Sequence, residues 1–167
     1  MSCRDKTDFI KISQKNILHN SASMFNVKTM TKFSDIMLGF HFVSGDEYGE
    51  ARALLCKETG KIYYLSDIVE EEEDIPEDID DEDLYMDIPN KVDLDLGRQI
   101  VFDFASEYLP QEQSKIYSFF ERKGAYAKFK NYLAEKEILD QWFAYEETVQ
   151  ENALRQWCKQ NDIDFEE

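Results

Sequence analysis

The sequence has few of the residues that common enzyme active sites need. Its 167 residues include two histidines, six glycines and three cysteines, and the motifs Gly-x-Ser-x-Gly and His-Glu-x-x-His and a glycine-rich phosphate loop are all absent. Those motifs position a nucleophile, a metal ion or a phosphate group. We therefore expect no cofactor and no metal site, and we favour a protein that is not an enzyme.

Long apolar runs and patterned cysteines are also missing. No stretch approaches the roughly 18 apolar residues of a membrane span, and the charged N-terminal segment has no apolar block of the signal-peptide kind. Cys3, Cys56 and Cys158 lack metal-ligand spacing, and an odd, sparse set is typical of reduced thiols. We expect a cytoplasmic protein with no membrane partner.

Acidic residues are concentrated in one segment. Twelve carboxylates lie between Asp67 and Asp83, where no Lys or Arg occurs; removing these twelve from the chain's 36 acidic residues leaves 24 against 19 basic ones. Such a density of like charge predicts a solvated loop, ordered only by a cation or a basic partner. Calcium loops need a glycine at a sharp turn, and none lies between Lys61 and Leu96. Nonspecific cation screening and mimicry of a phosphate track remain alternatives for this loop.

The first half of the chain predicts a small antiparallel sheet. Alternating apolar residues predict a hairpin of strands 51–57 and 61–66, with Gly60 free to take a positive φ in the turn. A third strand is predicted at 84–88. Phe33, Ile36 and Phe40 follow the helical i, i+3, i+7 spacing and predict a helix near 33–43, although the alternation around Phe40 leaves a strand open.

The second half predicts four helices. A stripe from Leu96 to Tyr108 defines the first, with Asp93 or Asp95 as its cap. The second ends at Gly124, a candidate left-handed cap; the third and the long fourth follow, to about residue 160. The fold class is thus α+β, a small antiparallel sheet packed with a four-helix C-terminal half.

The order of elements suggests a simple domain organisation. Residues 1–29 are polar and weakly periodic, which is typical of a flexible arm. A single α+β domain is expected over 30–163, with the acidic loop at 67–83 and an acidic tail at 164–167.

Several segments together resemble a known family. The run LLCKETGKIYYLSD, the run DLGRQIVFDFASEYLP, then GAYAKFK, LDQWFAYEE and RQW are similar in order to uncharacterised protein family 0158, a bacterial family with no established activity. The resemblance covers roughly residues 32–163 and implies no catalytic or binding residues. Family members often have Gly at the position of Glu137, where a left-handed non-Gly residue costs about 1 kcal/mol.

One corner combines basic and aromatic residues. Such a combination, with a glycine at the corner, can hold phosphate or single-stranded RNA; the alternative is an ordinary solvated helix face. Trp and Tyr can anchor a partner protein through their polar tips, although their spacing here also fits a core. The candidate binding residues are Arg122, Lys123, Gly124, Tyr126, Lys128, Lys130, Trp142 and Tyr145.

Three functions follow from these patterns. The first is a non-enzymatic interaction or regulatory protein whose partner is a protein. The second is an RNA- or nucleic-acid-associated protein that uses the corner at 122–130. The third is a carboxylate-dependent enzyme.

Overall fold

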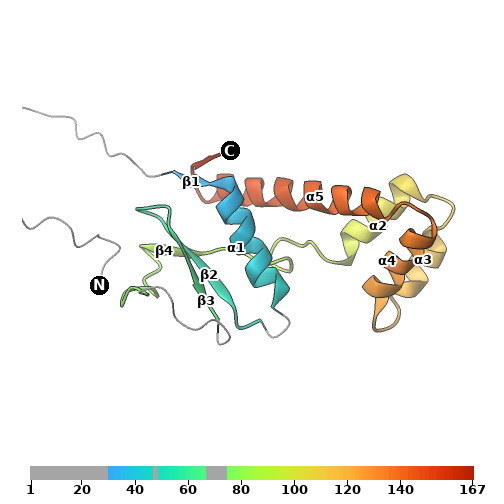
Figure 1. The fold of residues 1–167 in the computed structure, drawn as a ribbon, viewed down its shortest axis with the longest axis horizontal. Coiled ribbons are helices and arrows are strands. Elements are labelled where there is room, and N and C mark those ends of the chain that lie inside the picture. Colours follow the sequence, from blue (N-terminus) through green and yellow to red (C-terminus); the bar gives the residue numbers. More distant parts are fainter. Residues whose placement is uncertain (1–29, 47–48, 67–74) are drawn as a thin grey trace, which may run out of the picture. The chain divides into compact units, whose positions relative to one another are not determined.

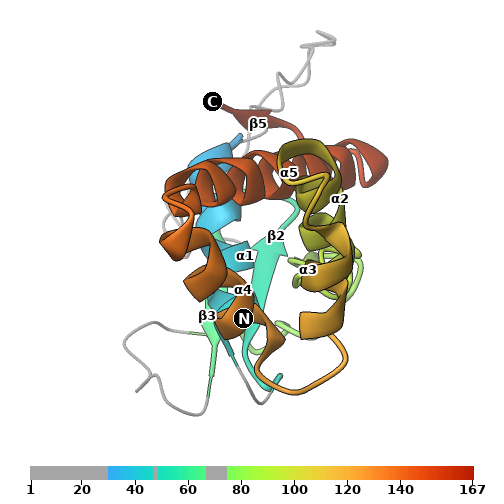
Figure 2. The same cartoon turned by 90° about the vertical axis from the view of Figure 1, so that its right-hand side faces the viewer.

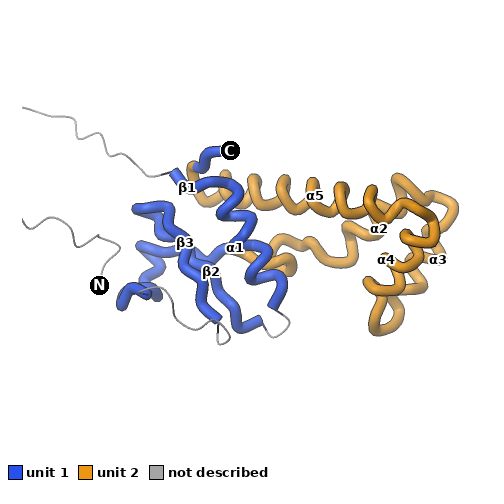
Figure 3. The backbone as a smooth tube through the Cα atoms, viewed as in Figure 1, with its two compact units in different colours: residues 1–88, 165–167 blue, residues 89–164 orange. Residues whose placement is uncertain are grey.

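The computed structural model describes residues 30–46, 49–66 and 75–167 (Figure 1). The chain divides into two compact units, unit 1 with residues up to Ile88 together with Phe165–Glu167, and unit 2 with Pro89–Asp164 (Figure 3). The described residues form an antiparallel three-stranded sheet and five helices, four of them in the C-terminal half. The α+β class is therefore confirmed, and the predicted arm at 1–29 lies outside the described residues.

The sheet of unit 1 follows the predicted hairpin closely. Its strands are β2 (Arg52–Cys56), β3 (Ile62–Leu65) and β4 (Tyr85–Asp87), and β2 lies between the other two. Gly60 has a φ of 73°, and its N–H donates to the Cys56 carbonyl at 2.8 Å. The predicted strands at 51–57, 61–66 and 84–88 are confirmed, because each observed strand lies within its predicted range.

Helix α1 (Phe33–Gly45) packs against this sheet. Ile36 and Phe40 are fully buried, so the helical spacing is confirmed and the strand alternative is wrong. Gly39 lies at the closest approach, since a Cβ at this position would stand 2.6 Å from Ile88 Cδ1. A glycine in the middle of a helix weakens it, and the close packing on the sheet explains its presence.

The C-terminal residues belong to unit 1 rather than to a solvated tail alone. Strand β5 (Phe165–Glu166) pairs in parallel with β1 (Thr31–Lys32). The rings of Phe33 and Phe165 lie 5.0 Å apart. Because the predicted tail is mostly acidic, the sequence did not predict that Phe165 packs against Phe33.

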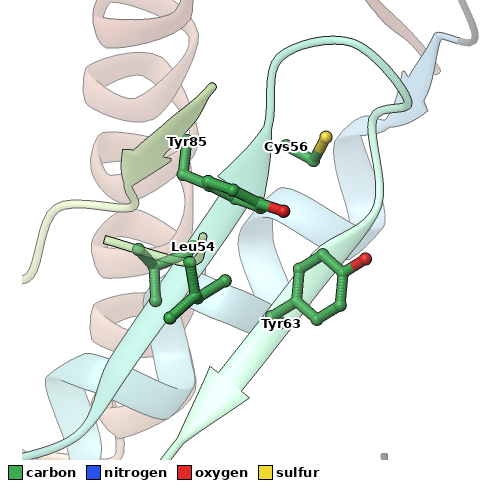
Figure 4. Packing of buried hydrophobic residues seen from close by; sticks show 5 residues of the cluster. Leu54, Cys56, Tyr63 and Tyr85 are labelled. Atoms are coloured by element: carbon green, nitrogen blue, oxygen red, sulfur yellow. The ribbon is translucent and has the colours of Figure 1, made fainter. Parts of the chain in front are cut away.

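The core of unit 1 explains why part of the acidic segment is folded. Ile79 is buried with Leu54, Tyr63 and Tyr85, and the last three are visible in Figure 4. Tyr63 and Tyr85 meet edge to face at 5.9 Å. Burial, followed by the nearby Asp78 carboxylate, raises the pKa of Tyr85 to about 12. The apolar side chains between the acids therefore fold part of the segment onto the sheet.

Ion pairs complete this attachment. The Arg52 guanidinium donates to Asp87 Oδ1 at 2.9 Å and Oδ2 at 3.1 Å, and to Asp80 Oδ1 at 3.0 Å. The Lys57 ammonium donates to the Glu82 carbonyl oxygen at 2.6 Å. Residues 75–83 meet the predicted condition for order, because Arg52 and Lys57 supply the basic partner while residues 77 and 80–83 stay exposed; residues 67–74 lie outside the described residues.

The two described cysteines, Cys56 and Cys158, differ in oxidation state. Cys158 is a buried free thiol whose pKa burial raises to about 11, so its thiolate is disfavoured. Cys56 takes part in a disulfide bond. The expectation that all three cysteines are reduced is therefore wrong for Cys56, because sequence spacing does not show which sulfur atoms meet.

Unit 2 consists of helices and turns. The helices are α2 (Arg98–Tyr108), α3 (Gln113–Phe119), α4 (Ala125–Glu135) and α5 (Leu139–Gln160). Neither predicted aspartate caps α2, which begins after Gly97. Asp93 instead accepts a hydrogen bond from the Asn90 N–H at 2.9 Å, and Asp95 has a φ of 55°. These residues form the turn before α2, so the cap prediction is wrong.

The core of unit 2 is built around one aromatic ring. Phe104 of α2 lies 5.2 Å from Trp142, 5.3 Å from Tyr145 and 6.3 Å from Phe129, measured between ring centroids. Edge-to-face rings at these distances stabilise a core beyond their buried area. The stripe predicted from Leu96 to Tyr108 thus faces α4 and α5 through Phe104.

Candidate functional site

A second group of rings lies on the surface of unit 2. Phe102 of α2 contacts Tyr117 of α3 at 4.3 Å and Phe120, just after α3, at 5.3 Å. Phe120 contacts Tyr126 of α4 at 5.2 Å. These four residues, Phe102, Tyr117, Phe120 and Tyr126, form a continuous set from three helices that we call the aromatic strip.

The strip is exposed to solvent. Tyr117 is 44% exposed and Tyr126 is 40% exposed, while Phe102 and Phe120 are half-buried. Partial burial, followed by the Glu146 carboxylate, raises the pKa of Tyr126. A hydroxyl with a raised pKa stays neutral and remains a hydrogen-bond donor, so the strip offers apolar rings with polar tips.

The turn beside the strip is fixed by Gly124. This residue has a φ of 77° and a ψ of 17°, so the predicted left-handed conformation is confirmed, and its carbonyl accepts the Lys128 N–H at 3.1 Å. The predicted helix end at Gly124 is wrong, because α3 already ends at Phe119 and Gly124 directly precedes α4. The left-handed conformation lets α3 and α4 lie side by side, connected by the turn seen in Figure 2. The turn therefore places Phe120 and Tyr126 close together, although they are six positions apart in sequence.

Four cations surround this turn. Arg122, Lys123, Lys128 and Lys130 are all exposed, and no acidic residue occurs between Arg122 and Lys130. In the part of the chain that the structure describes, none of the four forms an ion pair. Lys128 Nζ lies 4.6 Å from the centroid of Phe119, a cation–π contact that leaves its positive charge uncompensated. The first turn of α4 contains no acid, and its free N–H groups add to the positive potential.

Two of the predicted binding residues lie away from this surface. Trp142 is 1% exposed and belongs to the core around Phe104. Tyr145 is half-buried in the same core, where burial raises its pKa. The core alternative therefore describes both positions, and the structure brings together the other six predicted residues around the turn and α4.

A neighbouring polar cluster between α3 and α4 has a structural role. The Glu112 carboxylate accepts from the Lys136 ammonium at 2.6 Å and from the Tyr132 hydroxyl at 2.5 Å. The Lys136 hydrogen bond, followed by that of Tyr132, lowers the pKa of Glu112. Lys115 lies 4.0 Å from the centroid of the Tyr132 ring. These groups satisfy one another, so their charges hold the helix pair together.

Sequence reasoning missed Phe102, Tyr117 and Phe120 as surface residues. Phe102 lies off the stripe that α2 buries, which contains Ile100 and Phe104. Tyr117 follows the buried Ile116 on α3 in the same way. A large ring that lies next to the buried stripe of a helix, rather than on it, is the sequence signal that could have predicted exposure. Phe120 follows the buried Phe119 directly, but it lies just beyond the end of α3.

The described residues contain no group of three or more His, Cys, Asp or Glu side chains able to hold a metal ion. Among the same residues, no helix combines the length and the apolar character needed to cross a bilayer. The site offers aromatic, hydroxyl and cationic groups, which can contact a ligand through rings, hydrogen bonds and charge.

Comparison with known proteins found no matching family model, curated protein or solved structure.

Proposed function

We propose that this chain is a non-enzymatic interaction protein that binds a partner protein through the aromatic strip. The observation that carries the proposal is the continuous contact of Phe102, Tyr117, Phe120 and Tyr126 at the surface of unit 2. Protein-binding surfaces are enriched in aromatic residues and arginine, and a few such residues supply most of the binding energy.

The strip is better suited to binding a protein than to stabilising the core of unit 2. Its two tyrosines keep at least 40% of their surface in solvent, and the rings that stabilise unit 2 are those around Phe104. Rings that already contact one another lose little conformational freedom when a partner covers them. Such preorganisation improves affinity because less entropy is lost on binding.

Affinity capture with the full chain tests this function. The double variant Tyr117→Ala, Tyr126→Ala removes the two exposed rings of the strip, and Phe143→Ala removes a ring of α5 that is 45% exposed and belongs to no contact of the strip. A protein captured by the wild type and by Phe143→Ala, lost from the double variant and then shown to bind as a purified pair, supports the proposal. Equal binding of that purified partner to all three chains, or no captured partner, contradicts it.

Single-stranded RNA is the second candidate ligand. The observation that favours it is the set of cations beside Tyr126, which have no acidic partners among the described residues. Nuclease treatment before capture separates the two ligands. A partner that survives nuclease supports protein binding, whereas retention of an RNA pool that is lost after charge reversal at Lys128 and Lys130 supports the second candidate.

Membership of uncharacterised protein family 0158 and a cytoplasmic location are also proposals; the disulfide bond of Cys56 counts against the second, because disulfides are rare in the cytoplasm. The left-handed conformation of Glu137, with a φ of 60°, supports the first because the resemblance places a glycine there. Fractionation of the native cell, with detection of the full chain, tests the second: recovery outside the cytoplasm would contradict it.

A further inference from the structure

We propose that the partner binds the aromatic strip through an acidic segment that carries apolar side chains. This inference rests on the proposed function and names the chemistry of the partner. Its basis is the combination, on one surface of unit 2, of exposed rings with four cations that have no acidic partner among the described residues.

The distribution of cations gives the first step. Arg122 and Lys123 precede Gly124, and Lys128 and Lys130 follow it on α4. All four lie within four positions of Phe120 or Tyr126 along the chain, and these two residues form one end of the strip. A ligand covering these two rings therefore meets positive charge from both sides of the turn. Complementary charge increases the rate of association and selects between partners.

Two acids near the strip, Glu121 and Glu146, offset only part of this charge. Glu121 precedes Arg122 and is exposed, and Glu146 lies 4.0 Å from Lys91, with which it forms an ion pair. Lys136 is already bonded to Glu112. Four exposed cations against the one exposed acid Glu121 leave a net positive charge around the turn. The chain carries a net charge of −17, so this basic surface has the opposite sign to the protein as a whole.

The geometry of the rings favours a protein segment over RNA. Adjacent rings of the strip meet at 64°, 76° and 81°, so the edge of one ring covers part of the face of the next. Bases bind single rings by stacking on open faces. Aliphatic and aromatic side chains fill the angles between tilted rings more readily. Only Arg122 among the four cations offers the planar fork that binds carboxylate and phosphate bidentately, and the three lysines bind either anion as point charges, so the preference for a protein segment rests on the geometry of the rings.

Fluorescence anisotropy of the full chain with defined probes tests the inference. The main probe is a labelled peptide in which Asp and Glu alternate with Leu and Phe. One matched peptide replaces the acids with Asn and Gln, a second replaces Leu and Phe with Ser, and a labelled oligouridylate represents RNA. The inference predicts that the main probe binds at least about tenfold more tightly than each of the other three.

Variants assign the binding to this surface. Arg122→Glu with Lys130→Glu reverses two of the exposed cations, and Lys32→Glu with Lys159→Glu makes the same change of net charge at exposed residues elsewhere. We expect the first pair to weaken binding of the main probe by at least about tenfold and to remove its salt dependence, and the second pair to change it little.

The outcomes separate this inference from the proposed function. Equal binding of the main probe and its Asn and Gln counterpart, tighter binding of oligouridylate, or equal effects of the two charge reversals would overturn the acidic partner. If a captured protein is lost from Tyr117→Ala, Tyr126→Ala but retained by Arg122→Glu, Lys130→Glu, the proposed function stands and the acidic partner is wrong. Loss of the captured protein from both variants supports both.

Discussion

Unit 1 and unit 2 use their charged and aromatic residues in different ways. In unit 1, Arg52 bonds to Asp80 and Asp87, and Lys57 bonds to a backbone carbonyl, so cations fasten the chain to its own sheet. In unit 2, the cations beside the strip have no acidic partner among the described residues, and rings remain at the surface. The contrast indicates that the described cations of unit 1 are used for folding, while unit 2 uses some, such as Lys136, for folding and leaves others exposed beside the strip.

The largest expected change in stability follows from removing a core ring of unit 2, and it should far exceed the change from removing a ring of the strip. Trp142→Ala leaves a cavity beside Phe104 and Phe129 and should lower the free energy of unfolding by about 4 kcal/mol. Tyr117→Ala should lower it by less than about 1 kcal/mol, because the ring is exposed. Urea denaturation followed by circular dichroism measures both. Similar losses for the two variants would remove the distinction between core and strip.

The next effect concerns the contact of α1 with the sheet of unit 1. Gly39→Leu places a side chain where even a Cβ comes within 2.6 Å of Ile88, and overpacking should lower the free energy of unfolding by about 3 kcal/mol. Gly45→Ala is the control, because nothing lies within 4 Å of a Cβ there. A Gly39→Leu protein as stable as this control would show that α1 does not pack as described.

A smaller effect, in the stabilising direction, is expected at the turn before α5. Glu137 has a φ of 60°, so Glu137→Gly should raise the free energy of unfolding by about 1 kcal/mol by relieving this conformation. The same replacement in the middle of α5, Glu147→Gly, should lower it by about 1 kcal/mol. Thermal denaturation of the pair checks the sign, and a destabilised Glu137→Gly protein would contradict the left-handed assignment.

The smallest effect concerns the attachment of residues 75–83. Arg52→Ala should cost at most about 1 kcal/mol, because exposed ion pairs are weakened by solvent. Its local effect is more informative: hydrogen exchange around Ile79 should become faster. Arg52→Lys should have an intermediate effect, since it keeps the charge but loses the paired bonds to Asp87. Unchanged exchange in Arg52→Ala would show that the apolar contacts of Ile79 hold this segment alone.

Much of the fold followed from local patterns. The hairpin, the third strand and the helix from Phe33 were predictable because alternation and helical spacing report which face of an element is buried. The turns at Gly60 and Gly124 were predictable because glycine tolerates positive φ. Each of these signals is contained within a few neighbouring residues.

Features that depend on residues far apart were not predictable. The attachment of residues 75–83 includes an ion pair with Arg52, which is 28 positions before Asp80. The pairing of β5 with β1 joins Phe165 to Thr31. The aromatic strip likewise needs three helices to be placed before Phe102 can meet Tyr117. The basic residues of the candidate site were found from sequence because they are contiguous, and most of the rings were missed because they are not.

The most direct test of the strip as a binding surface is a comparison of hydrogen exchange in the full chain, free and bound to the captured and purified partner. The account predicts slower exchange in the complex at the segments that carry the strip, around Phe102 of α2 and from Tyr117 to Tyr126. Protection confined to the sheet of unit 1, with the strip segments unchanged, would contradict it.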